Sequence, residues 1–514
     1  MEGRECDPTR APITPDQCTL EPDPLGITKI RRYMRVTGLC LAVDIIPFNH
    51  TFTNLVRAVA ERVFFVKKDG IFQRPPSPVS FSHRLFRVKE SLKGFLPSTV
   101  PWTYEEFLGT CRGRKQKIYR DAYDSLFTDG PVTSKDARIE VFIKYEKTDC
   151  TTKVDPVPRV ISPRSPRYNL CLGRFLKKAE PKIFKSLGKL FGEPTVIKGY
   201  NAYQSAKILR RKWDRFADPV AVGLDASRFD QHVSIDALRW EHSIYLECFP
   251  IRRHRVKLQR LLNMQLVNNC VGYTDDGKLK YKIEGTRMSG DMNTSLGNCL
   301  IMCCMIKAYL EETGVDGSLA NNGDDCVVFM DRSDLAKFSH GLKEWFLEMG
   351  FDMKVEDPVD IFEKVEFCQT QPIFDGRRWL MVRKPDAIFS KDTTFLQPYQ
   401  SPKQVLNWMY AVGQGGLRLT GGIPIVQNFY RAYMKYGKPG KLPEDYFSWY
   451  QRQQLNSMDR DFGPVTPECR DSFHSAFGFT PTEQQVLERA IDSWVFRLER
   501  VAGFSDPPIQ PLYE

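Results

Sequence analysis

Four aspartates stand where two predicted buried strands end, Asp225 with Asp230 and Asp324 with Asp325. A carboxylate at the end of an apolar run costs free energy unless a cation lies nearby. Mg²⁺ prefers oxygen ligands and commonly uses one or two carboxylates together with substrate phosphates. Two such ions about 3.5–4 Å apart can activate an attacking hydroxyl and stabilise a leaving oxygen. This pattern therefore points to metal-assisted phosphoryl transfer.

The alternative is that Asp-Asp only forms turns. Residues 275–277, Asp-Asp-Gly, lie between the predicted strands 270–274 and 278–283, and we expect them to form a simple turn. Residues 319–329 differ because apolar runs flank Asp324 and Asp325 and Asn-Gly precedes them, which predicts a buried hairpin.

Between the two clusters lies the segment 289–298, Ser-Gly-Asp-Met-Asn-Thr-Ser-Leu-Gly-Asn. Gly290 permits a sharp loop, and a predicted helix over residues 293–310 puts Thr294 and Asn298 on one face. Their hydroxyl and amide groups could bind a ribose. A helix cap with an incidental asparagine is the other interpretation.

Cations precede these motifs on extended segments, at Lys144 and Lys147 and then at Arg159 and Arg164. Arginine binds phosphate through a bidentate fork and lysine as a point charge, so these residues could hold a triphosphate. Solvated strand edges are the alternative. The chain has no GxxxxGK[ST] motif, which excludes a P-loop ATPase or helicase.

Composition sets the wider limits. The chain has 514 residues with 42% hydrophobic and 27% charged, which excludes wholesale disorder. The net charge of +11 favours a polyanionic partner. Three basic stretches, around residues 112–120, 174–189 and 252–255, could line a phosphate backbone, with interleaved aromatic residues suited to single strands.

The sequence shows no pattern typical of disulfides, zinc sites, signal peptides or membrane spans. The 14 cysteines form no CxxC pair, which predicts buried thiols in a reducing cytosol rather than disulfides or zinc ligands. We identify no signal peptide and no membrane span, and the most apolar run, residues 299–305, predicts a buried helix.

Together these segments resemble the ordered motifs of viral RNA-dependent RNA polymerases, in particular the replicases of tombusviruses, carmoviruses, dianthoviruses and luteoviruses of plants. Residues 223–234 resemble motif A, 289–298 motif B, 321–329 motif C, 350–358 motif D, 367–385 motif E and 144–169 motif F. One such motif is weak, but six in family order are specific.

The resemblance implies an α+β right-hand polymerase with an antiparallel palm sheet flanked by helices. Fingers and fingertips would comprise residues 1–215, including motif F at 141–169. The palm would be 216–385, interrupted by a fingers insertion at about 250–284, and a mostly helical thumb would be 386–514.

The resemblance also implies roles for the site residues. Asp225, Asp324 and Asp325 would bind two Mg²⁺ ions, with Mn²⁺ able to replace them. Lys354 would protonate the pyrophosphate leaving group, unless it is an ordinary surface lysine. The ribose would contact Asp230, Ser289, Gly290, Thr294 and Asn298. The triphosphate would contact Arg159, Lys144, Lys147 and Arg164, and which cation meets which phosphate stays open.

The partners implied are template and nascent RNA, ribonucleoside triphosphates, and a shorter membrane-anchoring viral replication protein or N-terminal extension made by readthrough or frameshift. The chain is then expected in the host cytoplasm at the cytosolic face of replication membranes, reaching the membrane only indirectly. A reverse transcriptase and a non-catalytic RNA-binding scaffold are the alternatives. Asp230 with Asn298 argues against the first, and the intact aspartates argue against the second.

Overall fold

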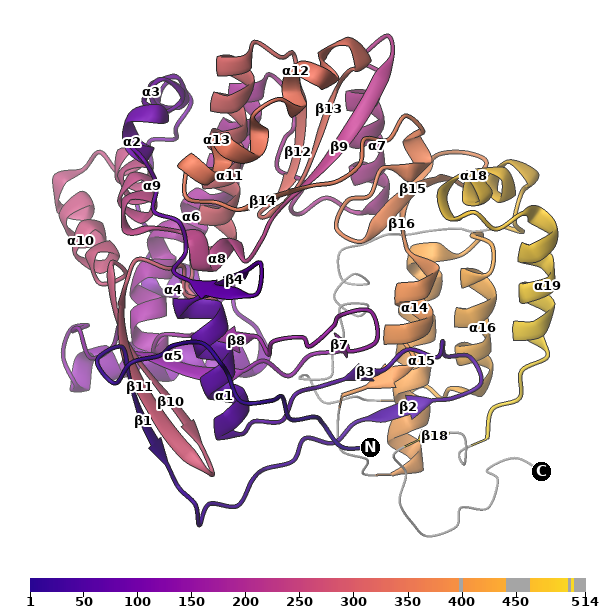
Figure 1. The fold of residues 1–514 in the computed structure, drawn as a ribbon, viewed down its shortest axis with the longest axis horizontal. Coiled ribbons are helices and arrows are strands. Elements are labelled where there is room, and N and C mark those ends of the chain that lie inside the picture. Colours follow the sequence, from indigo (N-terminus) through magenta and orange to yellow (C-terminus); the bar gives the residue numbers. More distant parts are fainter. Residues whose placement is uncertain (397–400, 441–462, 498–500, 503–514) are drawn as a thin grey trace.

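The computed structural model describes residues 1–396, 401–440, 463–497 and 501–502. Helices and strands are mixed along the chain, so the α+β class is confirmed. Figure 1 shows the C-terminal helices on the right and α10, β10 and β11 on the left, with β2, β3 and β7 running between them along the lower side.

The central sheet is antiparallel, with strand order β12-β13-β9-β14. Its strands are β9 (Pro219–Ala226), β12 (Ser318–Asn322), β13 (Asp325–Asp331) and β14 (Met353–Val355). Apolar residues occupy both faces of β9 and β13 because both faces are covered. Val222 and Leu224 join the core that contains α11 (Thr294–Thr313), whereas Val327 and Phe329 pack with α7 (Ala202–Trp213).

The buried helix α11 passes behind this sheet. Residues 299–305 are all 0% exposed, which confirms the predicted buried helix and explains why its sequence lacks a polar face. No helix in the described part of the chain is both long and apolar enough to cross a membrane. The surrounding helices are α2 (Phe81–Arg84), α3 (Phe86–Lys93), α6 (Pro166–Phe191), α9 (Ile235–Glu247), α10 (Arg252–Asn263), α12 (Leu335–Ser339) and α13 (Leu342–Glu348).

A second sheet has the order β1-β11-β10-β6-β8. It is built from β1 (Cys18–Pro22), β6 (Ile139–Ile143), β8 (Val160–Ile161), β10 (Val267–Thr274) and β11 (Gly277–Glu284). The segment 267–284 therefore joins strands from the first third of the chain. Asp275 and Asp276 form the expected turn between β10 and β11, and Asp276 accepts a hydrogen bond from the backbone of Phe52 at the start of α1 (Phe52–Val59).

Further short elements lie mainly in the N-terminal half of the chain. They are β3 (Ile45–Ile46) paired with β7 (Thr148–Asp149), β4 (Val66–Lys68) paired with β5 (Ile71–Gln73), the π-helical turn η1 (Ala60–Phe64), α4 (Tyr104–Gly109), α5 (Gly113–Thr128) and α8 (Phe229–His232). The helices α4 and α5 follow each other closely, separated by a break at residues 110–112.

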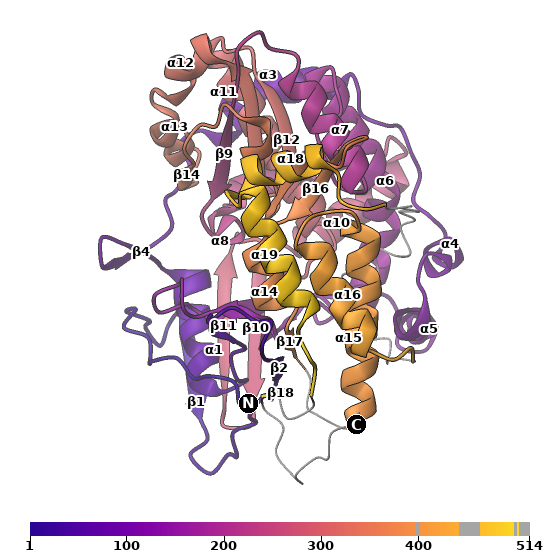
Figure 2. The same ribbon diagram turned by 90° about the vertical axis from the view of Figure 1, so that its right-hand side faces the viewer.

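The C-terminal region is mostly helical in its described residues, as expected. The hairpin β15 (Thr370–Phe374) and β16 (Trp379–Arg383) leads into α14 (Pro385–Lys391), α15 (Pro402–Thr420), α16 (Val426–Tyr436), α18 (Pro467–Phe477) and α19 (Pro481–Asp492). Figure 2 shows α15, α16 and α19 from the side that they cover. The strand β2 (Met34–Val36) pairs with both β17 (Thr394–Phe395) and β18 (Val501–Ala502), so the N-terminal segment closes onto this region.

The segment before β9 also lies with the central sheet. The backbone of Val196 bridges to Asn321, and α7 packs against β9, β12, β13 and β16. Residues 195–213 thus pack with the sheet that follows them, and the domain boundary at residue 215 stays a prediction.

Candidate active site

A two-residue turn joins β12 to β13. Asn322 pairs with Asp325, which leaves Gly323 and Asp324 as the central residues. Gly323 has φ +95°, and a type II′ hairpin turn requires glycine at this first central position. The buried Asn321 side chain donates to the carbonyl of Gly323 at 2.7 Å and accepts from its N–H at 3.1 Å. The Asn321 side chain therefore fixes the backbone of the turn that carries Asp324.

Strand register brings the predicted carboxylates together. Asp225 lies directly opposite Asp325 on β13 and opposite Lys354 on β14. Directly paired residues project from the same face of a sheet, so these three side chains share one face. It is the face that α7 covers further along the strands, and Asp324 and Asp325 are exposed where that cover ends.

Negative charge accumulates at this end of the sheet. Burial and then the Asp324 carboxylate raise the pKa of Asp225, while Lys354 and Lys153 oppose the shift. Burial and then Asp324 also raise the pKa of Asp325, with Asp225 adding to it. A cation placed between these groups would relieve the repulsion.

The donor set fits a hard divalent ion only in part. Among the described residues, no three or more His, Cys, Asp or Glu side chains gather closely enough to hold a metal ion unaided. Mg²⁺, however, binds through one or two carboxylates completed by phosphate oxygens and water. The paired Asp225 and Asp325 beside Asp324 suit an ion that arrives with a phosphate-bearing ligand.

A cavity of about 250 Å³ opens beside Asp324, and we call it the arginine cavity after Arg62, Arg159 and Arg228 in its wall. Four further residues predicted to contact a ribose also line it: Asp230, Ser289, Thr294 and Asn298. Residues from the N-terminal half and from three later motifs thus meet in one space.

The polar wall of the arginine cavity is held by hydrogen bonds. The Asn298 Nδ2 atom donates to Asp230 Oδ1 at 2.8 Å. Burial raises the pKa of the Asp230 carboxyl, and this hydrogen bond opposes the shift. Thr294, the first residue of α11, donates its hydroxyl to the carbonyls of Met288 and Asp291, at 3.1 and 3.0 Å.

Gly290 shapes the loop that carries Ser289. It has φ +133°, and a Cβ there would lie 3.2 Å from the backbone of Ser162 and Pro163. The Ser162 N–H donates to the Ser289 carbonyl at 2.7 Å, which ties this loop to the end of β8. Gly290 itself lines a neighbouring groove rather than the arginine cavity.

The three arginines come from separate elements. Arg62 of η1 donates to the carbonyls of Val157 and Pro158, and burial followed by Arg228 and Arg159 lowers its pKa to about 10. Arg228 has φ +49° and donates to the Glu61 carbonyl. Arg159 is 55% exposed and shares Glu146 with Lys144. Carbonyl oxygens orient Arg62 and Arg228 without neutralising them.

Two of the predicted triphosphate ligands lie elsewhere. Arg164 is fully buried, with its Nε 2.5 Å from Asp291 and further hydrogen bonds to Asn268 and to the Ala137 carbonyl. The structure therefore corrects the prediction for Arg164, because its donors are already used inside the fold. Lys147 donates instead to the carbonyl of Lys391 and lines a different cavity from Arg159, which argues against its predicted place beside the triphosphate.

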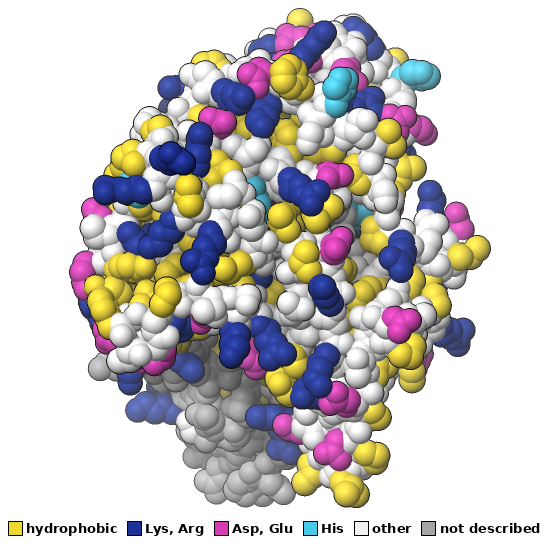
Figure 3. Space-filling model, turned by 90° about the vertical axis from the view of Figure 1, so that its left-hand side faces the viewer, with side chains coloured by type: hydrophobic (Ala, Val, Ile, Leu, Met, Phe, Trp, Pro, Cys, Tyr) yellow, Lys and Arg dark blue, Asp and Glu magenta, His cyan; other side chains and the backbone are white. Residues whose placement is uncertain are grey.

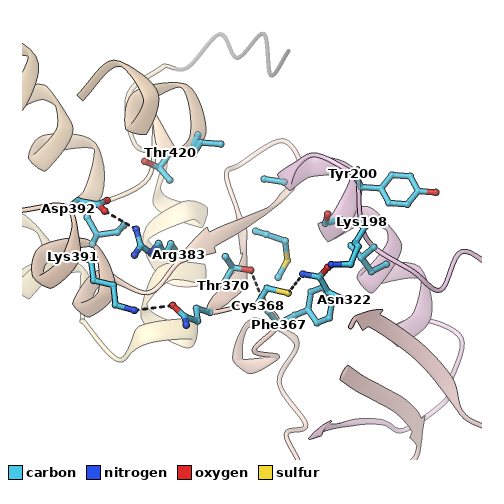
Figure 4. Close-up of a pocket in the computed structure, with 18 of the residues that line it drawn as sticks. Lys198, Tyr200, Asn322, Phe367, Cys368, Thr370, Arg383, Lys391, Asp392 and Thr420 are labelled. Atoms are coloured by element: carbon cyan, nitrogen blue, oxygen red, sulfur yellow. Dashed lines mark hydrogen bonds and ion pairs between the residues drawn. The ribbon is translucent and has the colours of Figure 1, made fainter. Parts of the chain in front are cut away.

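Lys147 borders a larger cavity, about 730 Å³, which we call the large cavity (Figure 4). It lies on the other side of the β12–β13 turn, where Asn322 donates to the Cys368 sulfur at 2.8 Å. Arg383 is paired there with Asp392 at 2.9 Å. Burial, with Arg383 and Lys391 nearby, lowers the pKa of Lys147 to about 8.

A third space, about 500 Å³, follows the turn on the α11 side, and we call it the lysine groove. Lys115 and Lys177, from two of the predicted basic stretches, line it with Tyr119 and Lys198. The third basic stretch, at the start of α10, lies on the face in Figure 3, where Lys and Arg side chains are dispersed among apolar and acidic ones. Arg255 of that stretch pairs with Glu247.

Sequence reasoning missed several site residues. Arg62 lies in a segment without a motif, and Lys198 lies in a short connection, so neither carried a signal. Arg228 lies inside motif A, but its residue type and spacing do not distinguish it from an ordinary exposed arginine. Lys153 belongs to the loop that separates the two halves of motif F, and its charge acts on Asp225.

Comparison with known proteins agrees with this geometry. Residues 19–499 match the family of viral RNA dependent RNA polymerases. The RNA-directed RNA polymerase of Oat chlorotic stunt virus is 47% identical over 489 residues, which are 91% of this chain and 65% of the relative. That of Tobacco necrosis virus is 44% identical over 483 residues (92% and 65%), and that of Cymbidium ringspot virus 42% over 476 residues (91% and 57%).

The chain therefore spans somewhat less than two thirds of the length of these curated relatives. The match extends from the N-terminal strands through the aspartate-bearing sheet to the C-terminal helices. On these grounds the chain belongs to the viral RNA-dependent RNA polymerase family.

Proposed function

We propose that this chain is an RNA-directed RNA polymerase that adds ribonucleotides to the 3′ end of RNA on an RNA template, and so replicates and transcribes a plus-strand viral genome. One observation carries the proposal. Asp225 lies opposite Asp325, and Asp324, in the turn between β12 and β13, lines the arginine cavity. In the reaction the 3′-hydroxyl oxygen bonds to the α-phosphorus while the bond to the bridging oxygen breaks, releasing pyrophosphate.

Viral RNA-dependent RNA polymerases use divalent metal ions. In this chain Asp225, Asp324 and Asp325 are the proposed ligands of two Mg²⁺ ions, for which Mn²⁺ can substitute. Such ions make the 3′-hydroxyl a better nucleophile and stabilise the leaving oxygen. The accumulated negative charge at the end of β9 and β13 supports this assignment.

The triphosphate is the proposed ligand of Arg62, Arg159 and Arg228. Support comes from their shared position in the arginine cavity and from the carbonyl contacts that orient Arg62 and Arg228 while leaving their charge available. Lys144 lies next to Arg159 through Glu146 and adds to the positive field. The proposed role of these groups is to position the phosphates, which is most of what phosphoryl transfer requires.

The ribose is the proposed ligand of Asp230, Ser289, Thr294 and Asn298, with Gly290 shaping the loop. A site built to hydrogen-bond a hydroxyl strongly disfavours a substrate that lacks it, because its own polar groups are left unpaired. This distinguishes the chain from a reverse transcriptase, which must accept deoxyribose.

Lys354 is the proposed proton donor to pyrophosphate. Its support is the register that places it opposite Asp225, with its side chain exposed at the same end of the sheet. The lysine groove, with Lys115, Lys177 and Tyr119, is the proposed path of the single-stranded template.

In the proposed right hand, residues 216–385 form the palm, residues 1–215 with the insertion at 250–284 the fingers, and residues 386–514 the thumb. The packing of α7 supports moving residues 195–213 to the palm. Recruitment to membrane-bound replication complexes in the host cytoplasm by a membrane-anchoring viral protein or extension stays a prediction.

The test uses the purified chain with an RNA template, ribonucleotides or deoxyribonucleotides, and Mg²⁺. Template-dependent incorporation of ribonucleotides, abolished by Asp324→Ala, supports the proposal. A preference for deoxyribonucleotides supports a reverse transcriptase instead. Template binding without synthesis supports a scaffold and overturns the proposal.

A further inference from the structure

Behind the wall of the arginine cavity lies an ion pair between Glu241 of α9 and Arg287, whose side chains are 0% and 1% exposed. The Arg287 Nη1 donates to Glu241 Oε1 at 3.1 Å, and its Nη2 donates to Oε2. Glu241 also accepts hydrogen bonds from Asn293 at 2.8 Å and from the Tyr245 hydroxyl at 2.7 Å. The guanidinium is therefore fixed in position and plane.

The same guanidinium reaches the cavity wall. Its Nε donates to Asn298 Oδ1 at 3.0 Å, and the Asn298 Nδ2 donates to Asp230 Oδ1 at 2.8 Å. The backbone N–H of Arg287 also donates to the Asp230 carbonyl at 2.9 Å. Glu241, Arg287, Asn298 and Asp230 thus form one continuous chain of hydrogen bonds that ends at the cavity.

This series of hydrogen bonds allows only one orientation of the Asn298 amide. If the amide turned over, its NH₂ would face the N–H of Arg287 and its oxygen would face the Asp230 carboxylate, so both contacts would become repulsive. Among the described residues only Asn298 donates to the Asp230 carboxylate, which leaves acceptor capacity directed at the cavity.

The fold makes room for this arrangement at some cost. A Cβ on Gly297 of α11 would lie 2.3 Å from Arg287 Nη2 and 2.5 Å from Glu241 Oε1, so only glycine fits. Thr286, which precedes the arginine, has φ +60°, a conformation that β-branched residues rarely adopt. Buried ion pairs add little net stability compared with apolar side chains of similar volume, so stability alone does not account for the pair.

We propose that Arg287, held by Glu241, is a positioning residue for sugar selection: it fixes Asn298 so that the amide and Asp230 together receive the ribose 2′-hydroxyl of the incoming nucleotide. This inference rests on the proposed polymerase function and adds to it a residue pair that does not touch the substrate's reacting atoms.

The main test is Arg287→Lys. Lysine keeps a positive charge beside Glu241 but cannot donate to Asn298 at the same time. We expect kcat/KM for a ribonucleotide to fall about tenfold while that for the matching deoxyribonucleotide is unchanged, because only the former has the hydroxyl. A purely structural defect would lower both values together.

The matched control is Arg470→Lys in the C-terminal region. Arg470 likewise bridges a carboxylate and an amide oxygen, with 2.9 and 3.1 Å to Glu488 and 3.3 Å to Gln484. It lies away from the cavity, so its substitution leaves the ratio of ribonucleotide to deoxyribonucleotide efficiency unchanged. The double variant Arg287→Lys, Asn298→Ala should be no less selective than Asn298→Ala alone.

The outcomes are distinct. Equal loss for both nucleotides in Arg287→Lys, or an unchanged ratio, overturns the inference while the polymerase function stands. If Arg287→Lys does not fold, the ratio is measured on Glu241→Gln, where a decrease supports the inference and an unchanged ratio overturns it. An unaltered chain that incorporates no ribonucleotide overturns the polymerase function, and the inference with it.

Discussion

The two cavities that flank the β12–β13 turn differ in how they hold three of their arginines, Arg62, Arg228 and Arg383. In the arginine cavity, Arg62 and Arg228 are held mainly by backbone carbonyls. In the large cavity, Arg383 is paired with Asp392, which also accepts from the Tyr430 hydroxyl at 2.8 Å. A cation held by carbonyl oxygens is oriented but keeps its charge for a ligand, whereas one held by a carboxylate is largely neutralised.

A difference in exposure separates two of the cations predicted from sequence to bind the triphosphate. Arg159 has an exposed guanidinium in the arginine cavity, whereas Arg164 forms a buried ion pair with Asp291 in the interior. Both stand in extended segments five residues apart, and type and spacing alone do not separate them. Both arginines have a carboxylate partner, Glu146 for Arg159 and Asp291 for Arg164, so the exposure of the guanidinium decides which of them can bind phosphate.

The largest expected effect concerns Asp324, in the β12–β13 turn, and Asp225, which lies opposite Asp325. Asp225→Asn and Asp324→Asn should each lower nucleotide incorporation by on the order of a thousandfold, because the charge that balances the metal ions is lost. The unfolding temperature should not fall, since these side chains repel one another. An active Asp225→Asn variant would contradict the proposed metal site.

The next effect concerns the loop of Gly290. Gly290→Ala forces an L-residue to φ +133° and brings its Cβ against the Ser162–Pro163 backbone, at a cost of about 1–3 kcal/mol. Displacement of Ser289 should lower kcat/KM roughly tenfold to a hundredfold. The control is Gly192→Ala, at φ +76° with no atom within 4 Å of its Cβ, which should affect stability only.

A third test contrasts Arg159 with Lys147. Arg159→Met should raise the KM for ribonucleotides about tenfold, because a charge-assisted phosphate contact is lost. Lys147→Met, on the side of the large cavity, should change that KM less than about twofold. Equal effects of the two substitutions on KM would remove the distinction between the cavities.

RNA affinity provides a smaller difference. Lys115→Met and Lys177→Met should each reduce the slope of log affinity against log salt by about 0.7 for single-stranded RNA. Arg252→Met and Arg253→Met, exposed on α10 away from the lysine groove, should leave the slope unchanged. Salt titrations with fluorescent RNA measure the slope for each variant. A slope reduced only by the Arg252 and Arg253 substitutions would place the template on the α10 face.

The smallest effect is a pH dependence of stability. The pKa of Lys147 is lowered from its ordinary value to about 8, so its ammonium destabilises the folded state fully below pH 8. This cost fades as pH rises from 8 and is absent above the unfolded pKa. Lys147→Met should therefore raise the unfolding temperature more at pH 7 than at pH 9.5, and a gain that grows with pH would contradict the assignment.

Local sequence patterns predicted the elements around the carboxylates well. The apolar run before Asp225, the hairpin around Asp324 and the buried helix through residues 299–305 all rest on short-range periodicity and turn chemistry, and all three are present. The turn itself has Gly323 and Asp324 at its centre, one step along from the Asn-Gly pair that indicated it.

What sequence reasoning could not supply is the contact between distant segments. Arg62 reaches the cavity because η1 packs beside Arg228 and α8, within motif A, and no local sequence pattern predicts that contact. The buried pairs Arg164–Asp291 and Glu241–Arg287 depend on long-range packing, so the residues of each pair look like ordinary charged positions in the sequence.

The pairing of Asp225 with Asp325 has a consequence for insertions and deletions. Side chains alternate between faces with a period of two, so one extra residue between Pro219 and Asp225 would turn that carboxylate toward the core around α11. Two extra residues would restore its direction. Length variation in this strand is thus permitted in even steps only, a constraint of parity that no conservative substitution can relieve.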